Sequence, residues 1–127
     1  MIIGTDLQSL VELKRRPGLF KSKAIFTTAE LEYTRGRRDP AASLGGILCA
    51  KEACIKAFSA FDSLPIFTFL DIEIRHMQNG RPFLHAGRRL AAWLDRHRLR
   101  VDLTISHSED YATATAILTL KHQEHAA

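Results

Sequence analysis

The chain has 127 residues, of which 46% are hydrophobic and 25% are charged, and its net charge is +4 with histidine neutral. This length suits one domain with a hydrophobic core of its own, and the composition is ordinary for a globular protein. No apolar run approaches the roughly 20 residues that span a bilayer, and the N-terminus lacks the pattern of a signal peptide. We therefore expect a soluble, cytoplasmic protein with no membrane partner.

Basic residues gather in the segments 13–23, 34–38 and 87–100. Such a charge balance serves solubility, and it also favours an anionic partner such as nucleic acid, a phosphorylated ligand or an acidic protein. No RNA-recognition signature, zinc finger or basic zipper is present, so nucleic acid is not expected. Cys49 and Cys54 have a spacing that suits neither a zinc site nor a disulfide framework, so buried free thiols are predicted.

The first half of the chain predicts one strand and three helices. Residues 1–6 indicate a short buried strand that stops at the aspartate, and residues 7–16 place apolar side chains at helical spacing before a Pro-Gly break. Thr27 and Glu30 form the S/T-x-x-E capping box that starts a second helix. Apolar and small residues recur at helical spacing over residues 40–61, which predicts the longest buried helix.

The second half is richer in strands. Alternation or β-branched and aromatic content predicts strands over residues 67–77, 81–86, 101–108 and 111–120. Asn79-Gly80 indicates a hairpin in which both turn positions favour positive φ, and residues 86–99 form an amphipathic helix pattern. We expect a compact α+β domain over residues 1–120, with a mostly antiparallel sheet packed on the long central helix, and a frayed tail over 121–127.

Two carboxylates are candidate magnesium ligands. Asp6 directly follows the first strand and Glu52 lies inside the long helix, and paired carboxylates with phosphate oxygens and water are a usual way to hold Mg²⁺. Two plainer interpretations stay open. Asp6 suits the N-cap of the next helix, and Glu52 suits an (i, i+4) pair with Lys56 that contributes about 0.3–0.5 kcal/mol on a surface.

The segment "TISHSED" offers a second candidate. His107 stands at a strand end with a side chain that can act as a general base near neutral pH, or it is a hydrogen-bonded structural residue. Thr104, Ser106 and Ser108 suit phosphate binding or simply the end of a strand. The sequence contains no base-activated nucleophile pattern, no phosphate-binding P-loop and no dinucleotide fingerprint.

Four motifs in order give these signals a common meaning. They are "IIGTDL", then "LGGILCAKEACIKAF", then "DIEI" with "NGRPFL", and last "LTISHSEDYATATAIL". Together they resemble the opening G-x-D, the K-E-A-x-x-K-A, the G-[KR]-P and the closing S-I-S-H motifs of the holo-(acyl-carrier-protein) synthase type of 4′-phosphopantetheinyl transferase. The resemblance covers nearly the whole chain.

The resemblance implies an activity and an assembly. Family members transfer the phosphopantetheine arm of coenzyme A to a serine of an apo acyl-carrier protein and release adenosine 3′,5′-bisphosphate, with Mg²⁺ bound. The family fold is a compact α+β domain that forms a homotrimer, with active sites between subunits. The implied chemistry is mostly positioning and neutralisation of charge around a pyrophosphate.

The resemblance also assigns roles to individual residues. Asp6 and Glu52 match the Mg²⁺ carboxylates, and Lys56 matches the lysine near the pyrophosphate, so these three are the expected catalytic residues. Lys51 matches a lysine that contacts coenzyme A. The proton of the carrier serine is expected to pass to a water on the metal, or to Glu52 through a water.

The closing motif supplies the remaining expected contacts with coenzyme A. His107 matches the histidine near the phosphates of coenzyme A, and Ser106 beside it is expected to bind them as well. His107 is a further candidate for the proton acceptor.

The chain departs from the family pattern in three places. Ile47 stands where an arginine helps bind coenzyme A or the carrier, and Glu12 stands where an arginine faces the acidic carrier. Residues 14–16 are basic and suited to compensate for Glu12, while residues 59–65 replace the family's G-T-G loop. These changes predict an active transferase with an unusual carrier preference, such as one fatty-acid or polyketide carrier.

Two alternatives from other functional classes remain at this point. The changes at Ile47 and Glu12 suit a degenerate paralogue that binds coenzyme A or a carrier without transfer. The basic composition suits a nucleic-acid-binding module, which would bind with a steep salt dependence but has no motif to support it.

Overall fold

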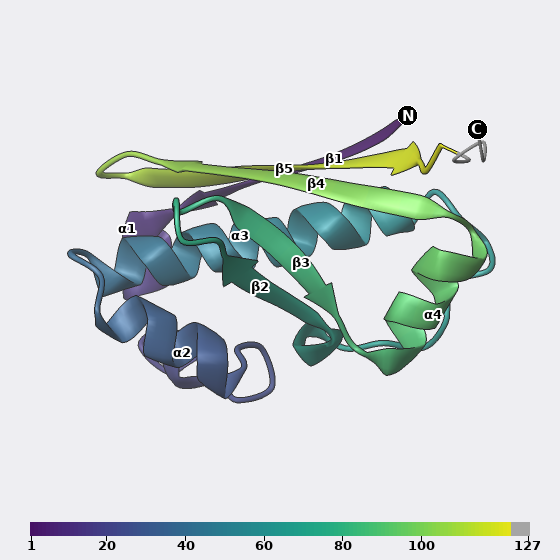
Figure 1. Ribbon diagram of the computed structural model, residues 1–127. Coiled ribbons are helices and arrows are strands. Elements are labelled where there is room, and N and C mark those ends of the chain that lie inside the picture. The colour runs from purple at the N-terminus through teal and green to yellow at the C-terminus, as the bar shows by residue number, and fades with distance from the viewer. Residues whose placement is uncertain (123–127) are drawn as a thin grey trace.

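The computed structural model describes residues 1–122, so residues 123–127 of the predicted frayed tail lie outside the described part (Figure 1). In chain order its elements are β1 (Ile2–Ser9), α1 (Leu10–Lys14), η1 (Leu19–Lys21), α2 (Thr28–Arg35), α3 (Pro40–Phe58), η2 (Phe69–Asp71), β2 (Ile72–His76), β3 (Pro82–Ala86), α4 (Arg88–Arg96), β4 (Leu99–His107) and β5 (Tyr111–Leu120). The predicted α+β class is confirmed.

Both sheets are antiparallel. The larger sheet has the strand order β1-β5-β4, and the smaller one is the β2–β3 hairpin. Figure 1 shows α3 running along one face of the larger sheet, with α2 and α4 toward opposite ends of the molecule. Small inward side chains on β5, among them Ala112, Ala114 and Ala116, are fully buried and let α3 lie close to the strands.

The long helix α3 is the centre of the core, as predicted. Asp39 caps its start by accepting a hydrogen bond from the Ala42 N–H at 3.1 Å, and Pro40 occupies the first turn, where its missing N–H costs nothing. Most of its residues are buried because the sheet, the hairpin and α2 cover it from several sides. No helix in residues 1–122 is long and apolar enough to cross a membrane.

The two cysteines are buried free thiols, as predicted. Cys49 lies on the sheet side of α3 and donates its S–H to the Ala112 carbonyl at 3.3 Å. Burial raises the pKa of both thiols to about 12, and for Cys49 the nearby Asp6 carboxylate adds to the effect. Neither thiol has the exposed, electropositive surroundings of a reactive cysteine.

The first strand is longer than predicted, and the helix after it is shorter. β1 pairs with β5 along its whole length, from Ile2 opposite Leu118 to Ser9 opposite Tyr111, so it does not stop at the aspartate. The apolar spacing after Asp6 therefore combines strand alternation with a single helical turn. Ser9 accepts from the Glu12 N–H and is the N-cap, so the interpretation of Asp6 as the cap is wrong.

The β2–β3 hairpin is present, but its turn differs from the predicted two-residue type. The Gly80 N–H donates to the Met77 carbonyl at 2.8 Å, and the Met77 N–H donates to the Arg81 carbonyl at 2.8 Å. Gly80 has a φ of +90°, whereas Asn79 is not in the positive-φ region. The connection is thus a turn followed by a glycine in the left-handed region, which is a longer common hairpin geometry.

Gly4 determines how closely β1 approaches α3. A Cβ atom at this position would fall on the Ala53 carbonyl oxygen and within 2.7 Å of the Ala57 backbone nitrogen. Because both neighbours are main-chain atoms of a buried helix, they have little freedom to move aside. Only glycine allows the strand and the helix to pack at this separation.

We expect the Gly4→Ala variant to lose about 3 kcal/mol or more of unfolding free energy, because overpacking here displaces backbone rather than a flexible side chain. Gly18→Ala is the matched control. Gly18 has helical backbone angles and open space around its Cα, so alanine there should stabilise the protein by about 0.4–1 kcal/mol. Urea unfolding of both variants measures the difference. Equal stability of the two variants would contradict the close-packing argument.

Candidate functional site

The two predicted carboxylates face each other across the β1–α3 contact. Asp6 points from β1 toward the helix and Glu52 lies on the facing turn of α3. The Nε2 atom of Gln8 joins them: it donates to Asp6 Oδ2 at 2.9 Å and to Glu52 Oε2 at 2.7 Å. Asp6 and Glu52 are called the carboxylate pair below.

Lys56 completes this group from the same helix. Its Nζ atom donates to Asp6 Oδ1 at 3.1 Å and to the Thr5 carbonyl at 3.0 Å. Its side chain is 58% exposed, while that of Asp6 is only 8% exposed, so the ammonium group can also meet a ligand from solvent. Among the ion pairs of residues 1–122, none joins Lys56 to Glu52, so the alternative of a simple (i, i+4) pair is wrong.

The surroundings of the carboxylate pair shift the pKa values of its two members in opposite directions. Burial and the neighbouring Asp6 raise the pKa of Glu52 to about 7. Burial also acts to raise the pKa of Asp6, but hydrogen bonds from Gln8, Glu52 and Lys56 outweigh it and leave that pKa below its ordinary value. Two close carboxylates with one lysine thus lack positive charge, which is the condition that a bound divalent cation relieves.

The donor set fits a hard oxygen-seeking cation. Carboxylate oxygens are the protein ligands that Mg²⁺ prefers, and Mg²⁺ usually keeps water or phosphate oxygens in its remaining positions. In the described part of the chain, no group of three or more His, Cys, Asp or Glu side chains gathers as a closed metal cage. The carboxylate pair therefore suits an open site, with positions left for water and for a substrate phosphate.

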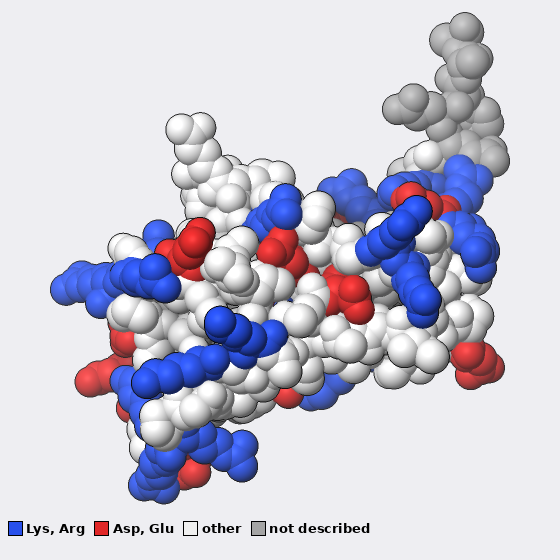
Figure 2. Space-filling view, turned by 90° about the horizontal axis from the view of Figure 1, so that it is seen from below, with Lys and Arg blue, Asp and Glu red and all other residues white. Residues whose placement is uncertain are grey.

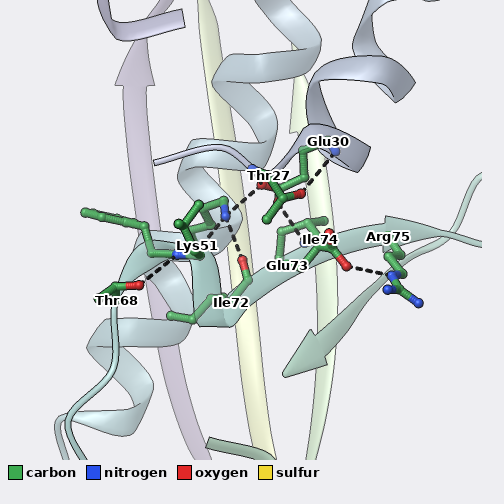
Figure 3. A network of polar contacts seen from close by, with 10 residues as sticks. Thr27, Glu30, Lys51, Thr68, Ile72, Glu73, Ile74 and Arg75 are labelled. Atoms are coloured by element: carbon green, nitrogen blue, oxygen red, sulfur yellow. Dashed lines mark hydrogen bonds and ion pairs between the residues drawn. The ribbon is translucent and has the colours of Figure 1, made fainter. Parts of the chain in front are cut away.

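Lys51 does not lie in this site, in contrast to the expectation that it contacts coenzyme A. Its side chain is completely buried, and its Nζ atom lies 2.8 Å from Glu30 Oε1 and 2.8 Å from the carbonyls of Phe69 and Ile72 (Figure 3). These three partners use all three ammonium protons. Lys51 points away from its neighbour Glu52 because consecutive helical residues lie on different faces.

Glu30 is equally buried and equally satisfied. One of its carboxylate oxygens accepts from Lys51 and from the Thr27 N–H at 2.8 Å, and the other accepts from the Ile74 N–H at 2.8 Å. The predicted capping box is confirmed, and the same glutamate also ties α2 to α3 and β2 (Figure 3). Burial lowers the pKa of Lys51, while the charge of Glu30 acts in the opposite direction.

His107 and Ser106 are exposed at the end of β4. No hydrogen bond or ion pair links either residue to the carboxylate pair within residues 1–122. The strand register nevertheless relates His107 to the residues of the carboxylate site. His107 pairs with Ala112, and Ala112 pairs with Gln8, so the three side chains project to the same side of the sheet. Two strand spacings, about 10 Å, separate Gln8 from His107.

A cavity of about 400 Å³ adjoins His107 at the start of α3. It is lined by Arg37, Arg38, Asp39, Pro40, Ser43 and His107. Its two arginines and its histidine suit an anionic group. The sequence indicated the basic segment 34–38, but the spatial meeting of this segment with the closing motif required the fold.

Gln8 is the site residue that the sequence analysis missed. A strand ending at Asp6 left no reason to place Gln8 on the same face. Once β1 is known to continue to Ser9, the two-residue spacing puts Gln8 beside Asp6. The alternation of side chains along a strand would have placed Gln8 on the face of Asp6. The helical spacing of the apolar residues from position 7 onward led instead to the prediction of a helix there.

Two residues that depart from the family pattern, Glu12 and Ile47, lie around the site. Glu12 is paired with Arg15 at 3.0 Å on the exposed surface of α1, so its charge is partly neutralised. Ile47 is 1% exposed and packs in the core, where it offers no contact to a ligand. Figure 2 shows Lys and Arg side chains concentrated toward both ends of the face seen from below, with acidic side chains among the uncharged residues between them.

Comparison with known proteins shows the family to which the chain belongs. The family model described as the 4′-phosphopantetheinyl transferase superfamily matches residues 2–116. The chain belongs to this superfamily. The match runs from the start of β1 into β5 and so includes all residues of the site described above.

Relatives of the transferase include the holo-[acyl-carrier-protein] synthases of Moorella thermoacetica, 38% identical over 88% of this chain and 85% of the relative, and of Caldanaerobacter subterraneus, 31% identical over 92% and 93%. Among solved structures, the Chronobacterium ammoniagenes ACPS-CoA complex matches with a TM-score of 0.77 and 31% identity over 95% of this chain and 98% of that chain. The Neisseria meningitidis synthase also gives 0.77 and 31%, over 94% and 99%. The compact transferase fold is therefore confirmed.

The buried pair yields a prediction about stability. Lys51→Met leaves Glu30 as an uncompensated buried charge, and Glu30→Gln does the same to Lys51, so each variant should lose about 3–5 kcal/mol of unfolding free energy. Lys23→Met is the matched control, since Lys23 is exposed and makes no ion pair in the described structure. Urea denaturation measures all three variants. A Lys51→Met variant as stable as the control would show that this network does not hold α2, α3 and β2 together.

Proposed function

We propose that this transferase moves the 4′-phosphopantetheine arm of coenzyme A to a serine of an apo acyl-carrier protein in a Mg²⁺-dependent reaction that releases adenosine 3′,5′-bisphosphate. The observation that carries the proposal is the meeting of Asp6, Glu52 and Lys56 at the β1–α3 contact. The names of the relatives, holo-[acyl-carrier-protein] synthases, support the same activity and the same carrier class.

Each residue of the group has a distinct part in this reaction. Asp6 and Glu52 supply the carboxylate oxygens for Mg²⁺, which when bound neutralises charge on the pyrophosphate oxygens. Lys56 is held by Asp6 but remains half exposed, so its ammonium group can contact the same phosphates. Glu52 is also placed to accept the proton of the carrier serine, through a water, because only its Oε2 atom is engaged by Gln8.

The phosphate-bearing end of coenzyme A is assigned to the closing motif. His107 and Ser106 stand at the end of β4, and His107 shares its cavity with Arg37 and Arg38. Positive charge at this position suits a phosphate. Two strand spacings, about 10 Å, separate His107 from Gln8 in the same chain. We propose that pieces from two subunits complete the site.

The outer face of the larger sheet is suited to contact with another subunit. Ile3, Leu7 and Tyr111 project from this face and are 53%, 63% and 53% exposed. No described element covers them, whereas the opposite face of the same sheet is buried on α3. Apolar residues that are exposed together on one face of a sheet commonly mark a protein interface. We propose a homotrimer in which this face lies between subunits.

The carrier preference is proposed to differ from that of relatives with an arginine in place of Glu12. The Glu12–Arg15 pair leaves Lys14 and Arg16 as the free positive charges of this part of the described surface. A carrier docking here would meet fewer cations than on an all-basic helix. The competing proposal is a degenerate paralogue of the transferase. Such a protein would still bind coenzyme A but would not transfer the phosphopantetheine arm to any carrier.

The test is a transfer assay. The protein is incubated with coenzyme A, Mg²⁺ and a panel of apo carriers, and mass spectrometry should show one carrier heavier by one phosphopantetheine arm. Asp6→Asn and Glu52→Gln should each lower the rate about 100-fold or more, since several kcal/mol of charge stabilisation are lost. Glu32→Gln, at an exposed acid outside the site, is the matched control. Coenzyme A binding without modification of any carrier would favour the degenerate paralogue instead.

The trimer has its own measurement. Light scattering after size exclusion should give the mass of three chains for the unchanged protein and a smaller mass for Ile3→Asp, which places a charge on the proposed interface. Ile66→Asp is the control, because Ile66 is 84% exposed in the loop before η2, away from the sheet face. A monomeric unchanged protein at micromolar concentration would refute the assembly but not the chemistry.

A further inference from the structure

We infer that Gln8 is the third side chain of the metal site, with its amide oxygen as a ligand of the bound Mg²⁺. The inference rests on the proposed function, since it presumes that Asp6 and Glu52 hold the ion. It adds a neutral oxygen donor to a site in which the described side chains otherwise supply only two carboxylates. Three observations carry it: the position of Gln8, its two distances and its chemistry.

Gln8 is positioned by the strand itself. It lies two residues after Asp6 in β1, so both side chains project toward α3. Its single Nε2 atom contacts Oδ2 of Asp6 on the same strand and Oε2 of Glu52, which lies 44 residues further along the chain than Gln8. The amide therefore occupies the space between the two carboxylates, which is where a shared cation is expected to bind.

The two distances have the spacing of neighbouring metal ligands. Mg²⁺ binds oxygen at about 2.0–2.1 Å in an octahedron, so adjacent ligand atoms lie about 2.9 Å apart. The amide lies 2.9 Å from the Asp6 oxygen and 2.7 Å from the Glu52 oxygen. Each of these two carboxylate oxygens thus lies about as far from the amide as neighbouring ligands of one Mg²⁺ lie from each other.

The chemistry of the amide permits both states. Without a cation, the N–H₂ end faces the carboxylates and relieves their repulsion. A half-turn about the last side-chain bond exchanges the nitrogen for the carbonyl oxygen, and glutamine carbonyls are accepted ligands of hard cations. Asp6 Oδ1 is engaged by Lys56, so Oδ2, the oxygen that Gln8 now contacts, is the one left for the metal.

A second account of Gln8 makes the opposite prediction. If the amide acts only as a hydrogen-bond donor, it competes with the cation for the carboxylate oxygens. Its removal would then strengthen metal binding or leave it unchanged. If the amide oxygen is a ligand, its removal weakens metal binding. The sign of the change in affinity therefore distinguishes the two accounts.

The experiment uses Mn²⁺ as a paramagnetic substitute for Mg²⁺, since both prefer carboxylate and carbonyl oxygens. Electron paramagnetic resonance measures free Mn²⁺ in titrations of the full-length protein, with and without coenzyme A. The Gln8→Leu variant removes the amide at nearly constant size and should bind Mn²⁺ about tenfold more weakly, comparable with the loss of other supporting groups at metal sites. Gln8→Glu keeps an oxygen and should bind at least as tightly as the unchanged protein.

Gln78→Leu is the matched control, because Gln78 is exposed in the β2–β3 turn and the same chemical change there should leave affinity unaltered. Gln8→Asn provides a second variant if leucine impairs folding: its amide is withdrawn by one methylene, and Mn²⁺ binding should again weaken. Thermal unfolding confirms that the compared variants are folded. In ¹⁵N NMR, the side-chain N–H₂ signal of Gln8 should shift on addition of diamagnetic Mg²⁺ as its hydrogen bonds break.

The outcomes separate this inference from the proposed function. Unchanged or tighter Mn²⁺ binding by Gln8→Leu overturns the ligand role of Gln8, while Mn²⁺ binding that depends on Asp6 and Glu52 keeps the proposed site. Failure of the unchanged protein to bind Mn²⁺, even with coenzyme A, overturns both. Weaker binding by Gln8→Leu, retained binding by Gln8→Glu and no effect of Gln78→Leu support the inference.

Discussion

The packing of Gly4 on the backbone of α3 is the constraint on which the site depends. Because no Cβ separates the strand from the helix at this position, β1 lies close enough for Asp6 and Gln8 to reach the next turns of α3. The carboxylate pair and Lys56 therefore come together from two elements that are far apart in sequence. A wider separation would leave the same residues on the same faces without bringing them within hydrogen-bond distance.

The charged residues of α3 are divided between two environments. Lys51 faces the hydrophobic core, where Glu30 and two carbonyls satisfy it completely, and this network fixes the helix against α2 and β2. Glu52 and Lys56 face the partly open side, where their charges remain available for ligands. The rigid side of the helix thus supports the precise placement of the reactive side, which agrees with a reaction that depends mainly on positioning.

Much of this arrangement follows from the sequence. The long helix, the capping box at Thr27 and the buried thiols come from local patterns, and local patterns survive in the fold. The position of Lys51 could not be predicted, because a motif fixes spacing along a helix but does not show which partners surround each face. The extent of β1 was also underestimated, since alternation and helical spacing share the same leucines, and pairing with β5 decides between them.

The adjacent residues Lys51 and Glu52 illustrate how one motif can hold two independent requirements. Simultaneous replacement of Lys51 and Glu30 by apolar residues could preserve the fold, because hydrophobic contacts can often replace a buried ion pair. Glu52 has no such freedom under the proposed function, in which its carboxylate, held by Gln8 in this structure, binds the metal ion. In an alignment of relatives, position 51 should therefore covary with position 30, whereas position 52 should vary only where the catalytic activity itself is lost.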